Sequence, residues 1–328
     1  MRIQVCCDYH RYPAKMEPVA RGGACGARVL DILVQGLSEL GHEILYYLPK
    51  GLIGPLPEGV QQITTMVRDC DIVHYQNGDL RDPMFGVDGL PWVRTCHTDI
   101  ATRGDGRTDR SAARPNWIYV SRYLAGLYES DRFILNGIDF AEYIYSETKD
   151  DYILFLADLT RADRKGFATA VALSREVGFE LVVAGDAHED GPRLREIAAG
   201  ANVRFAGEVF GEQKAELLAG ARALLFPTQF NEAFGLVIAE ALASGTPVIC
   251  SDKGACPELV SDDVGFVCAT MDDYLVAFRD LDRISSASCR QKAERDLHYL
   301  RMARDYVREY ELQIAREAGQ LAGVGEGP

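Results

Sequence analysis

The chain has 328 residues, a formal net charge of −14 and a pI near 4.9. This length suits two domains of about 150 residues each, and the negative charge argues against nucleic acid or an anionic membrane surface as a partner. No apolar run reaches the roughly 18 residues of a membrane-spanning helix, and the first residues lack the apolar stretch of a signal peptide. The nine cysteines are scattered without a C-x-x-C pair, so neither a zinc site nor a disulfide framework is indicated. We therefore expect a cytoplasmic protein with reduced thiols.

Short apolar, β-branched runs alternate with helical patterns along most of the chain. In the first half, strands are predicted over residues 2–7, 43–48, 72–75, 92–96, 117–120 and 133–135, with a helix over 29–40. In the second half, strands are predicted over 152–156, 179–184, 203–206, 223–227, 247–251 and 265–268, with helices over 165–177, 212–218 and 236–243. This repetition predicts an α/β protein with two Rossmann-like domains, each a parallel sheet covered on both faces.

A polar stretch at residues 145–151 follows Asn136-Gly137-Ile138-Asp139 and is typical of a linker. We expect the first domain over 1–142 and the second over 146–305. Past Ala287 the pattern predicts one long helix to about Gly319. Its last part, from about 306 to 328, is expected to return to the first domain, and the alternative is a helix packed on the second domain alone.

The segment 227–258 carries the most informative chemistry. A strand ends at Pro227, a polar loop follows, and a helix begins near Gly235, which lets the backbone approach a ligand closely. The amino end of that helix offers amides and a partial positive charge that suit a diphosphate. Glu240 lies within the apolar helix, and a buried carboxylate is costly unless it is hydrogen-bonded. Two ribose hydroxyls would satisfy it, and Glu232 could face the same ligand. The alternative is that Glu240 caps a neighbouring loop and Glu232 is solvated.

The arrangement of these two glutamates resembles a known signature. Glu232 and Glu240, framed by Phe234-Gly235-Leu236 and Gly245-Thr246-Pro247-Val248, resemble the motif of retaining family-four glycosyltransferases of the GT-B fold. Shorter matches follow the same family order: Gly22-Gly23, Gly41-His42-Glu43, Asp71-Ile72-Val73-His74, Thr95-Cys96-His97, Asn136-Gly137-Ile138-Asp139, Lys165-Gly166 and Gly185.

The resemblance implies two Rossmann-like domains facing across a cleft, with the C-terminal helix crossing back to the first. It also implies transfer of a hexosyl group from a nucleotide-diphosphate sugar to a soluble acceptor hydroxyl, with retention of configuration. His97 would approach the transferring sugar, Glu232 would contact the sugar hydroxyls, and Lys165 would neutralise the leaving diphosphate. The alternative for His97 is a structural histidine at a strand end. By the same resemblance, Glu240 would bind the ribose hydroxyls of the donor, and the backbone of Phe234, Gly235 and Leu236 would bind its diphosphate or sugar. Gly185 would lie beside the nucleotide. Gly22 and Gly23 would form a loop close to the donor or the acceptor.

One departure from the family pattern concerns the phosphate site. The family usually has Gly-Arg-Leu before the Lys-Gly pair, whereas this chain has Ala157-Asp158-Leu159, two residues further from Lys165. Arg161 or Arg164 would supply the missing charge. Asp158 beside a diphosphate would be repulsive by roughly 1 kcal/mol or more at contact distance.

No cofactor is expected beyond the substrate nucleotide sugar, for which a UDP-sugar is the first expectation and a GDP-sugar the next. No Asp-x-Asp motif stands in a metal-binding context, so no metal is expected. The expected acceptor is a small molecule or an oligosaccharide, without membrane association. Two alternatives are an epimerase or phosphorylase of the same fold, and a non-catalytic nucleotide-sugar-binding protein.

Overall fold

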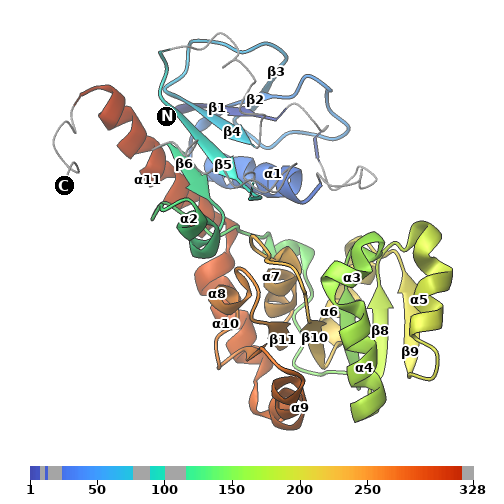
Figure 1. The fold of residues 1–328 in the computed structure, drawn as a ribbon. Helices are drawn as coiled ribbons and strands as arrows, with labels where there is room; N and C mark the ends of the chain where they lie inside the picture. Colours follow the sequence, from blue (N-terminus) through green and yellow to red (C-terminus); the bar gives the residue numbers. More distant parts are fainter. Residues whose placement is uncertain (8–11, 14–23, 77–88, 100–115, 320–328) are drawn as a thin grey trace, which may run out of the picture. The chain divides into compact units, whose positions relative to one another are not determined.

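The computed structural model describes residues 1–7, 12–13, 24–76, 89–99 and 116–319. The chain forms two compact units (Figure 1): unit 1 comprises Met1–Ile138 and Tyr299–Pro328, and unit 2 comprises Asp139–His298. Each unit contains one six-stranded sheet in which every pair of neighbouring strands is parallel. The predicted α/β class and the two Rossmann-like domains are therefore confirmed.

The sheet of unit 1 has the order β3-β2-β1-β4-β5-β6. Its strands are β1 (Arg2–Cys6), β2 (Glu43–Tyr47), β3 (Val60–Ile63), β4 (Ile72–Gln76), β5 (Trp92–Cys96) and β6 (Trp117–Tyr119). Its helices within the described residues are α1 (Ala24–Glu39), α2 (Arg122–Leu127) and α11 (Tyr299–Glu317). The inner strands β1 and β4 are buried along nearly their whole length, as expected for a parallel sheet covered on both faces.

Helix α11 belongs to unit 1 although it follows the whole of unit 2 in sequence, and it packs against α1 and β5 (Figure 1). A Cβ atom at Gly36 of α1 would lie 2.9 Å from the Cβ of Ala303, so glycine lets the two helices approach closely. The buried His74 on β4 joins the same contact: its Nδ1 lies 2.6 Å from the Tyr310 hydroxyl and its Nε2 lies 2.8 Å from Thr95 Oγ1. Burial lowers the pKa of His74 to about 3, so the imidazole is neutral.

The sheet of unit 2 has the order β12-β11-β10-β7-β8-β9. Its strands are β7 (Tyr152–Leu156), β8 (Glu180–Ala184), β9 (Val203–Gly207), β10 (Ala223–Phe226), β11 (Val248–Ser251) and β12 (Gly265–Cys268). Its α-helices are α3 (Ala162–Lys165), α4 (Phe167–Val177), α5 (Gly191–Ile197), α6 (Gly211–Gly220), α7 (Leu236–Ala243), α8 (Cys256–Leu259), α9 (Met271–Asp280) and α10 (Ser286–Leu297). Four 3₁₀ turns complete the unit: η3 (Phe140–Glu142), η4 (Leu159–Arg161), η5 (His188–Asp190) and η6 (Leu281–Arg283).

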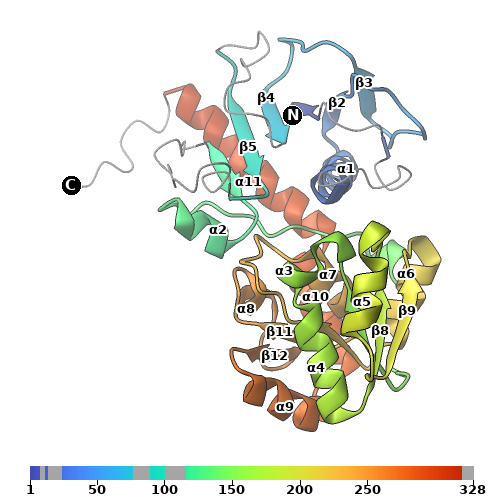
Figure 2. The same ribbon diagram turned by 45° about the vertical axis from the view of Figure 1, so that its right-hand side comes forward.

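The core of unit 2 has helices on both faces of its sheet (Figure 2). On one face, Phe167 and Val171 of α4 and Tyr274 of α9 pack with alternate strand residues such as Phe155 and Val183. On the other face, α7 packs against β10 and β11 and is itself flanked by α6 and α10. Read outward from β7, the strand order repeats that of unit 1 read outward from β1. The two units are thus two copies of one Rossmann-type topology.

Several sequence-based predictions differ from the structure. Residues 133–135 form no strand and only an isolated bridge from Phe133 to Tyr119, and strand β3 was not predicted. The predicted helix 165–177 is divided at Gly166, where a left-handed φ of +78° ends α3 and begins α4. The predicted long terminal helix is also divided, because His298 adopts an extended conformation between α10 and α11. The segment belonging to unit 1 begins at Tyr299 rather than near 306, and unit 2 begins at Asp139.

Candidate functional site

Strand order identifies one edge of the unit 2 sheet as the place for a ligand. From β7 the chain continues to β8 and β9 on one side, and then returns to β10 on the other side. The carboxyl ends of β7 and β10 therefore flank a topological switch point, where open α/β sheets bind their ligands. The segments that leave these two ends are 157–166 and 227–235, and together they contain most of the predicted donor-site residues.

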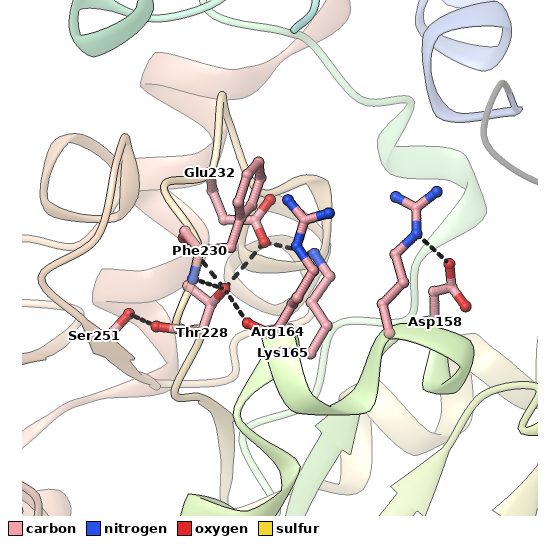
Figure 3. A network of polar contacts seen from close by, with 8 residues as sticks. Asp158, Arg164, Lys165, Thr228, Phe230, Glu232 and Ser251 are labelled. Carbon is pink, nitrogen blue, oxygen red and sulfur yellow. Dashed lines mark hydrogen bonds and ion pairs between the residues drawn. The ribbon is translucent and has the colours of Figure 1, made fainter. Parts of the chain in front are cut away.

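Lys165 and Glu232 meet at this edge (Figure 3). Lys165 Nζ lies 2.5 Å from Glu232 Oε1, and the Thr228 hydroxyl donates to the same oxygen over 3.3 Å. The two charged side chains are 21% and 11% exposed, so the ion pair is accessible only at its margin. Two residues predicted from separate motifs thus form one ion pair, in which a partly buried carboxylate and ammonium neutralise each other.

Glycines bring the two loops into contact. A Cβ atom at Gly166 would lie 1.9 Å from the carbonyl oxygen of Pro227, so only glycine allows this approach, and its φ of +78° is also a glycine conformation. The backbone oxygen of Arg164 accepts from Gln229 N over 2.8 Å. On the far side, Gly254 lies against the backbone of Glu232 in the same manner. The Lys-Gly pair therefore fixes the position of Lys165 relative to the loop that carries Glu232.

The amino end of α7 lies at the end of the same loop. Gly235 precedes the helix with φ of +98°, and no side chain caps the first turn, which begins at Leu236. Phe234 is buried. An eight-residue helix whose amino end has no side-chain cap leaves first-turn amides available to an anion. The backbone contacts of Phe234, Gly235 and Leu236 with the donor stay a prediction.

Glu240 is held by two side chains that sequence reasoning did not find. The Tyr143 hydroxyl donates to Glu240 Oε1 over 3.0 Å, and Lys214 Nζ on α6 lies 2.6 Å from Oε2. The expectation that Glu240 is buried is confirmed, since the residue is 6% exposed. Its carboxylate is already hydrogen-bonded without a ribose, so burial alone does not require the predicted ligand.

Asp158 has a structural role that the sequence did not reveal. Its carboxylate caps η4, accepting from Thr160 N over 3.1 Å, and it lies 3.4 Å from Arg161 Nε. Arg164 differs: its guanidinium carbon lies 4.1 Å from the centroid of the Phe230 ring, and Figure 3 shows it beside Lys165. The expected repulsion from Asp158 is thus offset by Arg161, while Arg164 faces the Lys165–Glu232 pair.

The predicted nucleotide-side glycine lies at the end of β8. A Cβ atom at Gly185 would lie 1.9 Å from the Ala157 carbonyl oxygen, which adjoins the end of β7, and the φ of Gly185 is +141°. Only glycine permits this contact. The close approach explains the residue structurally, and a nucleotide contact stays a prediction.

In unit 1, the predicted residue His97 follows β5. Gln76, the last residue of β4, donates from Nε2 to His97 Nε2 over 2.6 Å and to the Gly26 carbonyl over 2.7 Å. Because the carbonyl can only accept, the amide nitrogen is oriented unambiguously, and His97 Nε2 must accept. Burial lowers the pKa of His97 to about 4, consistent with a neutral ring. Gln76 is a second site residue that the sequence did not indicate; Gly22 and Gly23 lie outside the described residues.

No group of three or more His, Cys, Asp or Glu side chains is placed to hold a metal ion in the part of the chain that the structure describes. Among the helices that the structure describes, none has both the length and the apolar character needed to cross a membrane.

The two parallel six-stranded sheets have the fold seen in solved GT-B glycosyltransferases. Residues 150–290 match the family described as glycosyl transferases group 1. The phosphatidyl-myo-inositol mannosyltransferase of Mycolicibacterium smegmatis is 30% identical over 213 residues, which are 58% of this chain and 52% of that protein. The chain thus spans about half the length of this curated relative.

Two other comparisons support the same class. The O-antigen chain mannosyltransferase B of Escherichia coli is 36% identical over 91 residues, which are 28% of this chain and 23% of that protein. AviGT4, a glycosyltransferase involved in avilamycin A biosynthesis, has a solved structure that matches with a TM-score of 0.76 and 26% identity. That alignment covers 96% of this chain and 98% of AviGT4, so the similarity extends over both units.

Proposed function

We propose that the protein transfers a hexosyl group from a nucleotide-diphosphate sugar to an acceptor hydroxyl, with the donor bound by unit 2. The observation that carries this proposal is the meeting of Lys165 with Glu232 at the β7–β10 switch point. A cation for phosphate and a carboxylate for sugar hydroxyls stand together there. The uncapped amino end of α7 supplies further amides for the diphosphate.

The chemistry requires stabilisation of the leaving group. The bond between the sugar anomeric carbon and the diphosphate oxygen breaks, the acceptor oxygen bonds to that carbon, and the acceptor proton leaves with the diphosphate. Negative charge grows on the diphosphate, and cations and oriented amides offset that charge. In the proposed arrangement, Lys165 and the amides near Gly235 hold the diphosphate, Glu232 holds the sugar and Glu240 holds the ribose. Retention of configuration is a prediction from the family resemblance, and independence from metal is a prediction from the lack of an Asp-x-Asp motif in a metal-binding context.

Arg164, rather than Arg161, is the proposed second cation. Arg161 lies beside Asp158, and the carboxylate of Asp158 weakens the attraction of Arg161 for an anionic ligand. The guanidinium of Arg164 lies over the Phe230 ring, and such a cation–π contact orders a long side chain while leaving guanidinium N–H groups for phosphate oxygens. Because Asp158 serves as a helix cap, it does not favour the non-catalytic alternative.

The acceptor is proposed to bind to unit 1. His97, neutral and fixed by Gln76, is proposed to contact the transferring sugar as a hydrogen-bonding group rather than as a cation. The relatives named mannosyltransferases make mannose the first choice among donor sugars. The involvement of AviGT4 in avilamycin A biosynthesis favours a small natural product or an oligosaccharide as the acceptor.

The test begins with binding, which needs no knowledge of the acceptor. Isothermal titration of UDP, GDP and their hexose conjugates, including mannose, should identify one nucleotide that binds the wild-type protein. Lys165→Ala should weaken that diphosphate by about 10-fold or more, since a charged hydrogen bond contributes about 1.5–3 kcal/mol. The affinity for the corresponding nucleoside monophosphate should fall by a smaller factor. Absence of binding by every diphosphate at millimolar concentration would contradict the proposal.

Transfer is then measured as release of the nucleoside diphosphate across an acceptor panel. A sugar product with release of nucleotide only when acceptor is present supports transfer. Conversion of the donor without acceptor, or only with inorganic phosphate, would instead indicate the epimerase or phosphorylase alternative. NMR of the anomeric proton in the product tests the predicted retention.

A further inference from the structure

Helix α7 contains one charged side chain in an otherwise apolar sequence. Its buried residues are Ile238, Ala239, Glu240, Ala241, Leu242 and Ala243. The carboxylate of Glu240 accepts from the Tyr143 hydroxyl at one oxygen and pairs with Lys214 at the other. Tyr143 comes from the segment after η3 and Lys214 comes from α6, so three separate elements converge on one carboxylate.

A purely structural role explains this pair poorly. Burying an ion pair is no more stabilising than packing apolar side chains of similar size, because both charges lose their hydration. The side chains of Lys214 and Glu240 are 18% and 8% exposed, so the pair lies at the edge of the core rather than within it. A charged pair kept at such an edge is suited to a polar ligand.

The hydrogen-bonding capacity of the pair matches a vicinal diol. A carboxylate has about four acceptor positions and an ammonium has three donors. Tyr143 and Lys214 use two of the acceptor positions, and the ion pair uses one donor of Lys214. By count, two acceptor positions of Glu240 and two donors of Lys214 remain, which is enough for each hydroxyl of a diol to donate to Glu240 and accept from Lys214.

We infer that Lys214 is a ribose-recognition residue of the donor site and that Tyr143 positions the Glu240 carboxylate for the same diol. The inference rests on the proposed function, because it assumes a nucleotide at Glu240. It adds a statement about specificity: the site binds a ribonucleotide more tightly than the analogues that lack the 2′-hydroxyl or the 3′-hydroxyl of the ribose. Lys214 acts by direct contact, and Tyr143 acts through Glu240.

The experiment compares ribose and deoxyribose forms of one nucleotide. Whichever of UDP and GDP binds the wild-type protein is titrated together with its 2′-deoxy and 3′-deoxy analogues against wild type, Lys214→Met, Tyr143→Phe and Lys292→Met. Wild type should prefer the ribonucleotide by about 10-fold or more over at least one analogue. Lys214→Met should lose about 10-fold in affinity for the ribonucleotide and little for that analogue, so the preference disappears.

The control and the second variant separate recognition from folding. Lys292 also forms a largely buried ion pair, 3.0 Å from Asp296 on α10, and Lys292→Met should leave both affinities unchanged. Tyr143→Phe removes only a hydroxyl and should reduce the preference by about threefold to 10-fold. This variant decides the question if thermal unfolding shows that Lys214→Met does not fold.

Three outcomes are distinguishable. If wild type binds no nucleoside diphosphate, the proposed function fails before this inference is reached, and the inference fails with it. If wild type binds one but Lys214→Met lowers ribose and deoxyribose affinities equally, Lys214 has only a structural role and the inference is overturned while the proposed function stands. Loss of the ribose preference in Lys214→Met, with unchanged affinities in Lys292→Met, supports it.

Discussion

The ion pair between Lys165 and Glu232 predicts an unusual effect of removing a carboxylate. In Glu232→Gln, Lys165 loses its negative partner, and a diphosphate loses a nearby negative charge. We therefore expect this variant to bind the nucleoside diphosphate product more tightly than wild type does, while its turnover falls. Most substitutions in a binding site weaken binding, so the direction of the effect is informative.

The structure sets the magnitude. Lys165 Nζ lies 2.5 Å from Glu232 Oε1, and a phosphate oxygen bound to the same ammonium at about 3 Å would lie about 5 Å from the carboxylate. Two unit charges about 5 Å apart repel by about 3 kcal/mol at an effective dielectric constant of about 20, and by about 1 kcal/mol in bulk water. For a pair at the margin of the solvent, the expected gain in affinity is about 5-fold to 100-fold.

The assay is isothermal titration of the nucleoside diphosphate and of its sugar conjugate at fixed ionic strength. The conjugate should gain less affinity than the diphosphate, because the amide of glutamine replaces the proposed contact with the sugar hydroxyls. Turnover should fall because the sugar is less well held and the product leaves more slowly. Glu176→Gln is a suitable control, since Glu176 is exposed near the far end of α4. Unchanged or weaker diphosphate binding by a folded Glu232→Gln protein would refute the reasoning.

Three further predictions concern the glycine contact, acid stability and the second cation. Gly166→Ala should destabilise unit 2 by about 3 kcal/mol, because alanine in a left-handed conformation costs about 1–2 kcal/mol and its Cβ atom would displace the backbone at Pro227. Gly178→Ala is the control, since Gly178 has a similar φ and no atom near the added Cβ. In thermal unfolding it should show only the cost of the left-handed conformation. The pKa of His74 is lowered from 6.5 to about 3, so below pH 6.5 the unfolded chain binds a proton that the folded protein excludes. Urea denaturation should show stability falling by up to about 1.4 kcal/mol per pH unit between pH 6 and 4, less steeply in His74→Gln. Arg164→Ala should weaken the nucleoside diphosphate about 10-fold but the monophosphate little, whereas Arg161→Ala should change neither greatly; equal effects of the two variants would contradict the assignment.

The strand pattern and the site segment could be predicted because they depend on local features. Most strands of a parallel sheet buried on both faces are continuous apolar runs, and they stood out in the sequence within one or two residues of their observed ends. Edge strand β3 has the sequence VQQI and is only partly buried, so it lacks that signal. The division at His298 also has no local signal, since no Gly or Pro stands there. It reflects the return of the chain to unit 1, where Tyr299 N donates to the Ile138 carbonyl.

The partners of the predicted site residues could not be found in the sequence. Tyr143 and Glu240 are 97 positions apart, and Gln76 and His97 are 21 positions apart. Motif spacing places a residue at the end of a strand or helix, but it does not say which side chain from another element will lie against it. Tyr143 is an example: nothing in its sequence surroundings indicates that its hydroxyl donates to the buried carboxylate of Glu240.

The substitution at Asp158 and the length of its loop are best understood together. A chain with an acidic residue where the family has arginine requires another cation near the diphosphate, and the sequence left Arg161 and Arg164 as alternatives. Asp158 caps the η4 turn, and that turn places Arg161 beside Asp158. The chain then forms α3, whose end brings Arg164 against Phe230 and Lys165 against Glu232. Asp158 is thus a cap of the η4 turn, and the positive charge that we propose for the diphosphate comes from Arg164, one turn further along the chain.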